Sequence, residues 1–523
     1  MSVQIGIANG YLDLLDKLDA FLCNAGHAWG KTYSGVGNGT LTDYQGKPGS
    51  VAETFTLTAI NSTTFSVVGS VSGTLPNATV GTPYSSSKID FLLSAGSVPF
   101  SAGDQFRIST SPPWTRLRYH GCIDGLDRYG VGPWNTTYTP DRAFDGTTNY
   151  ARADGFPAWL GVTMHKPSEV NVALLTNADS TTQAPKDVAI EWSDDGANWT
   201  TAQTWTGLAW STTYETKTLT LATPPGAHRW WRLRIDSTQI GQTMASIAEL
   251  QLRAHIAHEW SLEDNFQAAW AAPGLDGSKA IHVGIIPVRN QAADTYNLTM
   301  RAWRFHDGNK SIEAQHNVST RCVMSLTDQP MNYWLVANGQ RVIVAAKIST
   351  TYQLAYLGFG FPYEPPSVHP WPCVIAGTSE DSTMRWSSTH PNHRLAFMPG
   401  DGMHAYYPDN LWRRVRNRSG GSGDDGSGDG SSGKVWPSAW NSGGAVLDWL
   451  RDRLDGGHVL IPCSILHAVS PVFHAWGELD GLYWVSGFGQ TAESLIAADG
   501  YEHLVIDNVF RTGLTNWGAI RLD

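Results

Sequence analysis

Cysteine is scarce in this sequence, and its few cysteines do not form a disulfide framework. The chain has five, an odd number with wide spacing: Cys23, Cys122, Cys322, Cys373 and Cys463. Small secreted domains that depend on disulfides carry even numbers of cysteines at short spacings. We therefore expect a chain that is synthesised and folded in a reducing cytoplasm, even if it later acts outside the cell.

Charge and long apolar runs are also scarce. Charged residues make up 16% of the chain and the formal net charge is −11, so no basic stripe is available for nucleic-acid phosphates. The one basic cluster, Arg413–Arg418, reads better as the flank of a loop. No stretch approaches the ~20 apolar residues of a membrane span, and Met1–Gln4 does not begin a secretory signal. We expect no nucleic-acid partner and no membrane insertion.

Catalytic signatures are missing as well. The metalloprotease pattern HExxH, the serine-hydrolase pattern GxSxG and the phosphate-binding P-loop do not occur. Carboxylate pairs such as Asp194 and Asp195 occupy turns, and their separation in space cannot be read from sequence. We therefore expect a protein that is not an enzyme.

Glycine, with 53 residues, and tryptophan, with 23, are abundant in this chain of 523 residues. Its length predicts three or four domains. Short alternating apolar and polar runs between Gly, Asn, Asp and Pro turns predict a mainly β, multidomain fold. A helix is predicted at 11–23, where an apolar stripe faces Asp13, Asp16, Lys17 and Asp19. We expect this helix to dock on its own domain or on a neighbouring subunit.

The most informative stretch is 114–254. It contains, in order, Ala143–Asn149 (AFDGTTN), Pro157–Val162 (PAWLGV), Ile190–Trp199 (IEWSDDGANW), Trp230–Ile235 (WWRLRI) and Ile247–Leu252 (IAELQL). Together these landmarks resemble the discoidin, or coagulation factor 5/8 C-terminal-type, family, which includes many carbohydrate-binding modules. The resemblance implies a central jelly-roll type β-sandwich that binds glycan. Because Trp230 and Trp231 are adjacent, one side chain should point inward and the other outward.

The flanking regions resemble proteins of tailed bacteriophages. Pro48–Phe106 resembles a small β domain of phage tail proteins, and Pro112–Pro113 marks its end. Ile281–Met398, with a hairpin signal at Asn338–Gly339, resembles a virion protein of the tail tip or baseplate. We expect domains at 1–113, 114–254 and 255–523, with phage-type β domains on both sides of the central module.

Three segments of the last region differ from the strands around them. Ser261–Ala271 and Ala445–Leu454 predict short helices. Ser419–Gly433 is rich in Ser, Gly and Asp and predicts a disordered insertion. Its aspartates lack the closing Glu that an EF-hand calcium loop needs, so a solvated linker is favoured over a calcium site.

The discoidin resemblance also implies a structural calcium ion between the Ala-Phe-Asp-Gly loop and the last strand. The implied ligands are the Ala143 carbonyl, Asp145, Thr148 and Glu249. Calcium takes about six to eight oxygen ligands, so two carboxylates with carbonyl and hydroxyl support are a reasonable start. The alternative is that Asp145 caps a turn and Glu249 makes a salt bridge.

Glycan binding requires flat aromatic rings for stacking, together with planar hydrogen-bonding groups for the hydroxyls. The loops of the central module supply these candidates: Tyr129, Trp134, Tyr150, Arg152, Asp154 and Trp210. The alternative for each aromatic residue is packing rather than ligand contact.

These expectations lead to one functional hypothesis. The chain is interpreted as a structural component of a phage tail tip or baseplate that presents a glycan-binding domain for attachment to the host surface. We expect it in the virion, with other tail or baseplate proteins as partners, and as a homotrimer or a hexamer. The alternatives are a glycan-degrading enzyme with catalysis in 255–523, and an adaptor whose discoidin-like domain contacts other virion proteins.

Overall fold

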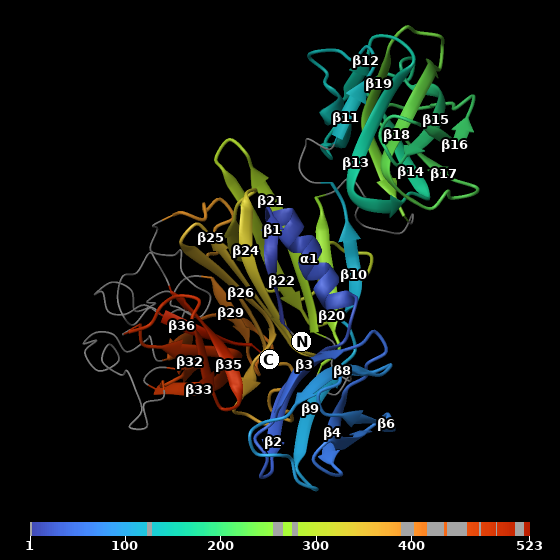
Figure 1. Ribbon diagram of the computed structural model, residues 1–523. Helices are drawn as coiled ribbons and strands as arrows, with labels where there is room; N and C mark the ends of the chain where they lie inside the picture. Colours follow the sequence, from blue (N-terminus) through green and yellow to red (C-terminus); the bar gives the residue numbers. More distant parts are fainter. Residues whose placement is uncertain are drawn as a thin grey trace. The chain divides into compact units, whose positions relative to one another are not determined.

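The computed structural model describes residues 3–122, 128–254, 265–274, 281–388, 402–415, 433–436, 458–469, 472–487, 489–507 and 517–522. These residues form many strands and one α-helix, which confirms the predicted mainly β, multidomain fold (Figure 1). They divide into two compact units. Unit 1 combines 1–116, 269–306 and 316–523, and unit 2 combines 117–268 and 307–315. No helix in the described ranges is long and apolar enough to cross a membrane.

Unit 2 contains two antiparallel sheets that enclose one core. The first runs in the order β11 (Arg128–Val131), β13 (Ala158–Glu169), β18 (Ala227–Thr238), β15 (Pro185–Ser193) and β16 (Thr200–Trp205). The second runs in the order β12 (Ala151–Ala153), β19 (Ala245–Arg253), β14 (Val172–Asn177) and β17 (Thr216–Thr220). Buried residues of both sheets, such as Leu160, Leu233 and Leu250, belong to the same core cluster. The predicted β-sandwich is confirmed.

Unit 1 contains two small sheets near its N-terminus that share a core, and we call them the N-terminal sheets. One runs in the order β2 (His27–Ser34), β9 (Gln105–Ser111), β4 (Glu53–Ala59), β5 (Thr64–Gly69) and β6 (Gly73–Thr79). The other runs in the order β3 (Thr40–Gly46), β8 (Ile89–Ser94) and β7 (Tyr84–Ser85). Inward and outward positions alternate along β4, as its sequence predicts.

Larger sheets make up the rest of unit 1. One is β1 (Val3–Asn9), β24 (Pro330–Ala337), β25 (Arg341–Ile348), β26 (Thr351–Phe359), β28 (Cys373–Ala376), β29 (Met403–Tyr406) and β30 (Trp412–Arg414). Another is β10 (Thr115–His120), β20 (Gln267–Ala272), β21 (Ile281–Asn290), β22 (Thr295–Trp303) and β23 (Cys322–Leu326). The unit boundaries at 116/117 and 268/269 fall within β10 and β20.

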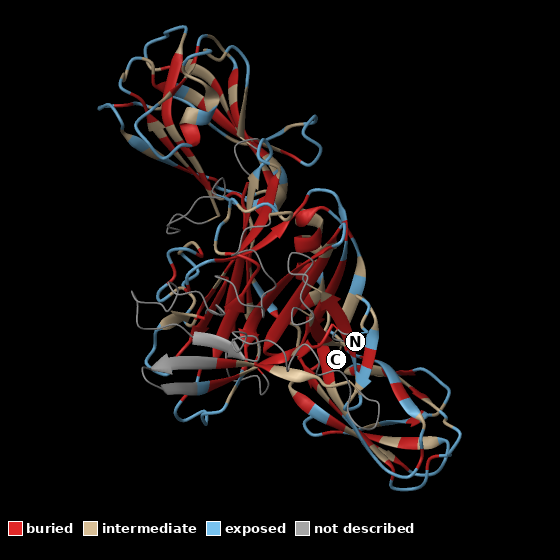
Figure 2. Cartoon of the chain, turned by 90° about the vertical axis from the view of Figure 1, so that its left-hand side faces the viewer, coloured by how far each residue is buried: buried red, intermediate tan, exposed pale blue. Residues whose placement is uncertain are grey.

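The C-terminal sheet belongs to the same unit. It runs in the order β31 (Gly433–Trp436), β32 (Ile461–Val469), β33 (Val472–Val485), β36 (Trp517–Leu522), β35 (Tyr501–Asp507) and β34 (Leu495–Ala498), and β27 (Phe361–Pro362) also pairs with β33. Residues of this sheet, such as Trp476 and Leu482, share a core cluster with Val336 and Ile343 of the seven-stranded sheet. Strand β26, in the middle of the seven-stranded sheet, is covered on both faces, because all nine of its positions are buried. Figure 2 shows the buried residues of the chain in red.

The predicted N-terminal helix is confirmed as α1 (Tyr11–Cys23), and it packs within unit 1. Its apolar stripe is buried and contacts β1, β22 and β24. The predicted polar face is wrong at one position, because Asp19 is buried. Its carboxylate accepts hydrogen bonds from Trp270 Nε1 at 2.9 Å and Arg116 Nε at 2.8 Å, which tie the helix to β20 and β10.

The predictions for the third region have mixed outcomes. The Asn338–Gly339 hairpin is confirmed, since Ala337 pairs with Val342 across the turn. The helix predicted at 261–271 is wrong from Gln267 onward, where the chain forms β20. All but one of the six β20 residues are buried, so this strand lacks the alternation that would have identified it. Residues 261–264, the predicted helix at 445–454 and residues 419–432 of the predicted insertion lie outside the described residues.

Candidate functional site

A loop of unit 2 lies alongside the short edge strand β12 and brings polar and aromatic residues together. The Asn135 N–H donates to the Arg152 carbonyl at 2.9 Å, and the Arg152 N–H donates to the Tyr138 carbonyl at 3.0 Å. The Asp154 N–H donates to the Pro133 carbonyl at 2.7 Å. These bonds hold the loop along the outer edge of β12. We call the residues that it gathers the Tyr138 cluster: Asn135, Tyr138, Arg142, Tyr150, Arg152 and Asp154.

The centre of the Tyr138 cluster is a stacked pair of aromatic rings. The Tyr138 and Tyr150 ring centroids are 4.8 Å apart, with an angle of 6° between the ring planes. Two guanidinium groups lie over the Tyr138 ring, Arg152 at 5.1 Å and Arg142 at 5.4 Å from its centroid. Such cation–π contacts hold an arginine in place without using its N–H donors. Both arginines therefore keep hydrogen-bonding capacity.

Asp154 fixes the orientation of Arg152. Its carboxylate accepts hydrogen bonds from Arg152 Nε at 2.7 Å and from Asn135 Nδ2 at 2.8 Å. These bonds, that of Asn135 first, lower the pKa of Asp154, so the group is charged at neutral pH. Asp154 is exposed, and Arg152 and both tyrosines are half-buried. The cluster thus presents aromatic surface, planar donors and a carboxylate acceptor, the groups that a polyhydroxylated ligand requires.

The other three candidate glycan-binding residues contribute no side chain to this cluster, although the backbone of Trp134 pairs with Ala153 beside it. Trp210 is 3% exposed and belongs to the core, where its Nε1 donates to the Pro185 carbonyl at 2.6 Å. A buried indole cannot stack on a sugar, so Trp210 leaves the candidate set. Trp134 is half-buried, and its Nε1 donates to the Trp159 and Val131 carbonyls, each at 3.1 Å.

Tyr129 lies on strand β11 rather than in a loop, the position predicted for it. Its ring covers Gly161 on the neighbouring strand β13, where a Cβ would come within 2.4 Å of the ring. Burial raises the pKa of Tyr129 to about 12, and its hydroxyl has no hydrogen-bond partner among the described residues. We therefore interpret Tyr129 as packing on the sheet rather than as part of the Tyr138 cluster.

The proposed calcium ligands are brought to one loop. Asp145 Oδ1 accepts from the Thr147 N–H at 2.9 Å, and Asp145 Oδ2 accepts from Asn149 Nδ2 at 3.2 Å. Burial would raise the pKa of Asp145, but these donors hold it below its ordinary value. Glu249 Oε2 accepts from the Gly146 N–H at 3.1 Å, so both carboxylates reach the same turn.

This arrangement has the donor chemistry of a calcium site without a complete set of ligands. Ala143 is buried beside the loop in the 3₁₀ helix Pro140–Phe144, and Thr148 is exposed. Both carboxylates now accept hydrogen bonds from protein groups, and a calcium ion would have to displace these donors. The coordination shell of the ion also needs about six to eight oxygens. No group of three or more His, Cys, Asp or Glu side chains placed to hold a metal occurs within the described ranges. Calcium binding stays a prediction.

Sequence reasoning missed Asn135, Tyr138 and Arg142, half of the Tyr138 cluster. Tyr150, Arg152 and Asp154 were predicted as loop residues with the aromatic and planar polar groups that a glycan requires, and the structure places them on or beside β12. The other three residues join the cluster through the backbone pairing between the loop and β12, which no local sequence pattern predicts. One signal was available, since Pro140 favours the start of a helical turn, and Arg142 lies in the 3₁₀ helix that begins there.

The comparisons with known proteins concern the same part of the chain. Residues 129–250 match the family model of the F5/8 type C domain. A pectin-binding carbohydrate-binding module is 20% identical and aligns with 25% of this chain and 91% of its own, with a TM-score of 0.21. The family 32 module of Clostridium perfringens NanJ, solved with galactose, is 19% identical over 25% of this chain and 98% of its own, with a TM-score of 0.22.

A third solved structure carries the family's own description. The F5/8 type C domain of a Bacteroides fragilis protein is 13% identical over 27% of this chain and 95% of its own, with a TM-score of 0.22. No curated protein matches the chain. The residues matched by the family model include the whole Tyr138 cluster, together with Asp145 and Glu249.

Proposed function

Since residues 129–250 form an F5/8 type C domain, we propose that unit 2 binds carbohydrate at the Tyr138 cluster. The observation that carries this proposal is the pair of arginines held over a stacked tyrosine pair next to a charged Asp154. A sugar ring would lie against the aromatic surface, Arg142 and Arg152 would donate to its hydroxyls, and Asp154 would accept from them.

The cluster is ordered before any ligand arrives. Arg152 is held by Asp154 at 2.7 Å and by the Tyr138 ring, so little side-chain entropy remains to be lost on binding. A shallow site of this kind binds a single sugar weakly. Several copies in one assembly would raise the avidity by about 10²–10⁴-fold.

We propose that the rest of the chain anchors this domain in a phage tail tip or baseplate, where the domain attaches the virion to a host-surface glycan. Support comes from the sequence resemblances of the flanking regions and from the division of the chain, because unit 2 is inserted between segments of unit 1. In this proposal unit 1 assembles with other tail proteins, as a homotrimer or a hexamer, and has no catalytic role.

We also propose calcium as a structural ligand of unit 2, held by Asp145 and Glu249 with the Ala143 carbonyl and Thr148. Calcium bound there would supply the positive charge that draws the Asp145 loop to β19. Added calcium should then raise the melting temperature of the full chain, and Glu249→Gln should abolish the shift. Magnesium is the control, because it demands a tighter octahedral shell. Equal responses to the two metals would contradict a calcium site.

The binding proposal is tested with the labelled full-length protein on an array of bacterial surface glycans. We expect saturable binding to at least one glycan, with a loss of at least tenfold on Tyr138→Ala or Arg152→Ala. Arg229→Ala is the matched control, because Arg229 also lies over an aromatic ring of unit 2, 4.8 Å from the Trp230 centroid. Release of reducing ends from the bound glycan is measured in parallel and should be undetectable.

Two outcomes would contradict the proposal. Binding that survives both cluster substitutions would place the site elsewhere on the domain. A correctly folded chain that binds no glycan, even when displayed in many copies on a bead, would leave the adaptor hypothesis. Release of reducing ends would instead favour the glycan-degrading enzyme.

A further inference from the structure

Strand β1 of unit 1 has an open edge. It is the end strand of the seven-stranded sheet and pairs along its whole length with β24, its one neighbour among the described strands. An edge strand presents a row of unpaired N–H and C=O groups, and natural proteins protect such edges with lysine, proline, bulges or very short strands. The seven residues of β1, VQIGIAN, include neither charge nor proline. Among the described residues, Val3–Ala8 of this edge carry none of these protections, and at the end of the strand the Asn9 N–H donates to Asp13 Oδ2 at 2.6 Å.

The exposed side chains of β1 are apolar. Ile5 is 59% exposed and Ile7 is 60% exposed, and residues two apart on a strand point to the same face. Ile5 pairs with Trp334 and Ile7 with Asn332 of β24, so the two isoleucines extend the face to which Trp334 belongs. The two isoleucines therefore form one continuous exposed apolar surface on this face of the strand.

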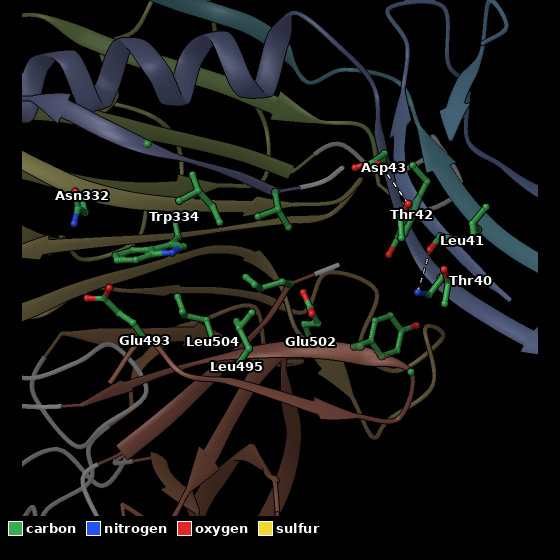
Figure 3. A pocket seen from close by; sticks show the side chains of 18 of the residues that line it. Thr40, Leu41, Thr42, Asp43, Asn332, Trp334, Glu493, Leu495, Glu502 and Leu504 are labelled. Atoms are coloured by element: carbon green, nitrogen blue, oxygen red, sulfur yellow. Dashed lines mark hydrogen bonds between the residues drawn. The ribbon is translucent and has the colours of Figure 1, made fainter. Parts of the chain in front are cut away.

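The isoleucines line a groove of about 1020 Å³ within unit 1. Trp334 lies on one wall, and Leu495 and Leu504 of the C-terminal sheet lie on the facing wall (Figure 3). Leu495 is 53% exposed. Asp43 and Thr42 of β3 lie at one end of the groove (Figure 3). Apolar walls and a free strand edge thus face the same space.

The charge of this groove is unbalanced. Asp43, Glu493 and Glu502 line it, against the single ammonium group of Lys31. Glu493 is already engaged, since it pairs with Lys347 and accepts from the Tyr352 hydroxyl at 2.7 Å. Asp43 and Glu502 are exposed. Because Lys347 neutralises Glu493, the groove keeps the two carboxylates of Asp43 and Glu502 against Lys31, a net charge of −1 that favours an occupant with positive charge.

We propose that this groove receives an extended basic and apolar segment of a partner protein, which adds to β1 as a further strand. Main-chain hydrogen bonds to β1 would provide affinity, and alternate side chains would provide specificity. Apolar side chains of the segment would lie against Ile5, Ile7 and Leu495, and Lys or Arg would lie near Asp43 and Glu502. A second copy of this chain that pairs through its own β1 is disfavoured as the occupant, because it would bring a second acidic groove to the first.

The probe is a displayed library of random twelve-residue peptides, selected against the full-length protein. We expect enrichment of sequences in which apolar residues alternate and Lys or Arg is frequent. A synthetic peptide from this selection should bind at least tenfold more weakly to the Ile5→Lys/Ile7→Lys variant. Ile240→Lys is the matched control, because Ile240 is also 60% exposed but lies in unit 2. Asp43→Asn/Glu502→Gln should weaken binding and reduce its salt dependence.

Methylation of single peptide nitrogens tests strand addition directly. Alternate N–H groups of an added strand face β1, so methylation at every second position should abolish binding and methylation between those positions should not. Three results with peptides would overturn the proposal: no enriched peptide that depends on Ile5 and Ile7, enriched peptides that are acidic, or methylation effects without this alternation. Self-association of the chain that the double lysine variant abolishes would identify a second copy as the occupant, and would overturn it too.

Discussion

Strand β26 of unit 1 and strand β18 of unit 2 lie inside their sheets but bury their residues differently. All nine positions of β26 are buried. Along β18, the buried residues Trp231, Leu233 and Ile235 alternate with the part-exposed Trp230, Arg232 and Arg234. The adjacent tryptophans of β18 thus confirm the predicted inward and outward pair. A sheet with one open face can carry polar recognition groups, whereas a sheet covered on both faces must match every polar group internally.

The charged residues of the two units follow this difference. In unit 2, Glu191 joins Arg232 at 2.7 Å and Arg234 at 2.5 Å on the outer face of the sheet, where both arginine side chains are partly exposed. In unit 1, Arg341 and Asp480 form an ion pair of 3.0 Å with side-chain exposures of 0% and 1%. Unit 1 therefore depends on charge pairing inside its core.

The largest loss of stability is expected from Asp480→Ala. Asp480 also accepts from Arg521 Nη2 at 2.9 Å and Asn338 Nδ2 at 2.9 Å. Burial alone would raise the pKa of Asp480, but Arg341 and Arg521 hold it below its ordinary value. Its removal leaves the Arg341 guanidinium buried without a counter-charge, which should lower the free energy of unfolding by about 3–5 kcal/mol. Denaturant unfolding of the full chain measures this loss.

Asp409→Ala is the control for that experiment, because Asp409 pairs with Arg413 at the surface of the same unit. Exposed pairs of this type contribute about 0–1 kcal/mol. Hydrogen exchange in peptides from unit 2 should be unchanged by either substitution. Similar losses for the two variants would show that the core of unit 1 is more hydrated than this structure indicates.

A second experiment tests the difference between β26 and β18 directly. Leu354 and Leu357 are 0% exposed and point to opposite faces of β26, so either change to Ala should lower the free energy of unfolding by about 2–5 kcal/mol. In β18, Leu233→Ala should have a similar effect, but Trp230→Ala should stay within about 1 kcal/mol. A large loss for Trp230→Ala would mean that the outer face of unit 2 is covered.

The same contrast explains which strands could be predicted from the sequence. Alternation identified the strands of unit 2 and of the N-terminal sheets, as in Glu53–Ala59. It failed at Gln267–Ala272, because a strand buried on both faces has no period to read. Nor could any local pattern pair β1 at Val3–Asn9 with β24 at Pro330–Ala337, since that pairing depends on packing of the whole unit.

The candidate site shows a similar limit. Arg152 and Asp154 could be named from sequence because planar donors and carboxylates are the groups that sugar hydroxyls require. Trp210 was misplaced because a loop position does not reveal that its indole N–H finds the Pro185 carbonyl inside the core. Tyr138 was missed because only the pairing of its loop with β12 brings it to Tyr150.

A smaller, pH-dependent effect is expected in the N-terminal sheets. Asp104 accepts from the backbone N–H groups of Ser101, Val36 and Gly37, each at 3.0 Å. These bonds, that of Ser101 first, hold the pKa of Asp104 at about 2. Asp104→Asn should lower the free energy of unfolding by about 1–2 kcal/mol at neutral pH.

The sign of the pH dependence follows from that depressed pKa. The carboxylate of Asp104 has a pKa of 3.8 in the unfolded chain, and its contribution to the free energy of unfolding is complete above that pH. This contribution is lost as the pH falls through about 2. The difference between the native chain and Asp104→Asn should therefore be constant near neutral pH and close below about pH 4. Urea unfolding at a series of pH values measures it. A difference that persists at about pH 2 would assign the effect to the shape of the amide rather than to charge.

Among these substitutions, Arg152→Ala should change the free energy of unfolding least and glycan binding most. Arg152 is half-buried, and its ion pair with Asp154 and its contact with the Tyr138 ring lie at the surface of unit 2. Arg152→Ala should therefore change the free energy of unfolding by no more than about 1 kcal/mol, while glycan binding falls at least tenfold. Arg152→Lys separates charge from shape, because lysine keeps the positive charge and loses the planar set of donors. If the Arg152→Lys variant binds glycan as well as the native chain does, charge alone is recognised and the geometry of the Tyr138 cluster is incidental. Arg341→Lys completes the comparison: there the same exchange should destabilise unit 1 without affecting glycan binding, because the donors that it removes belong to the core.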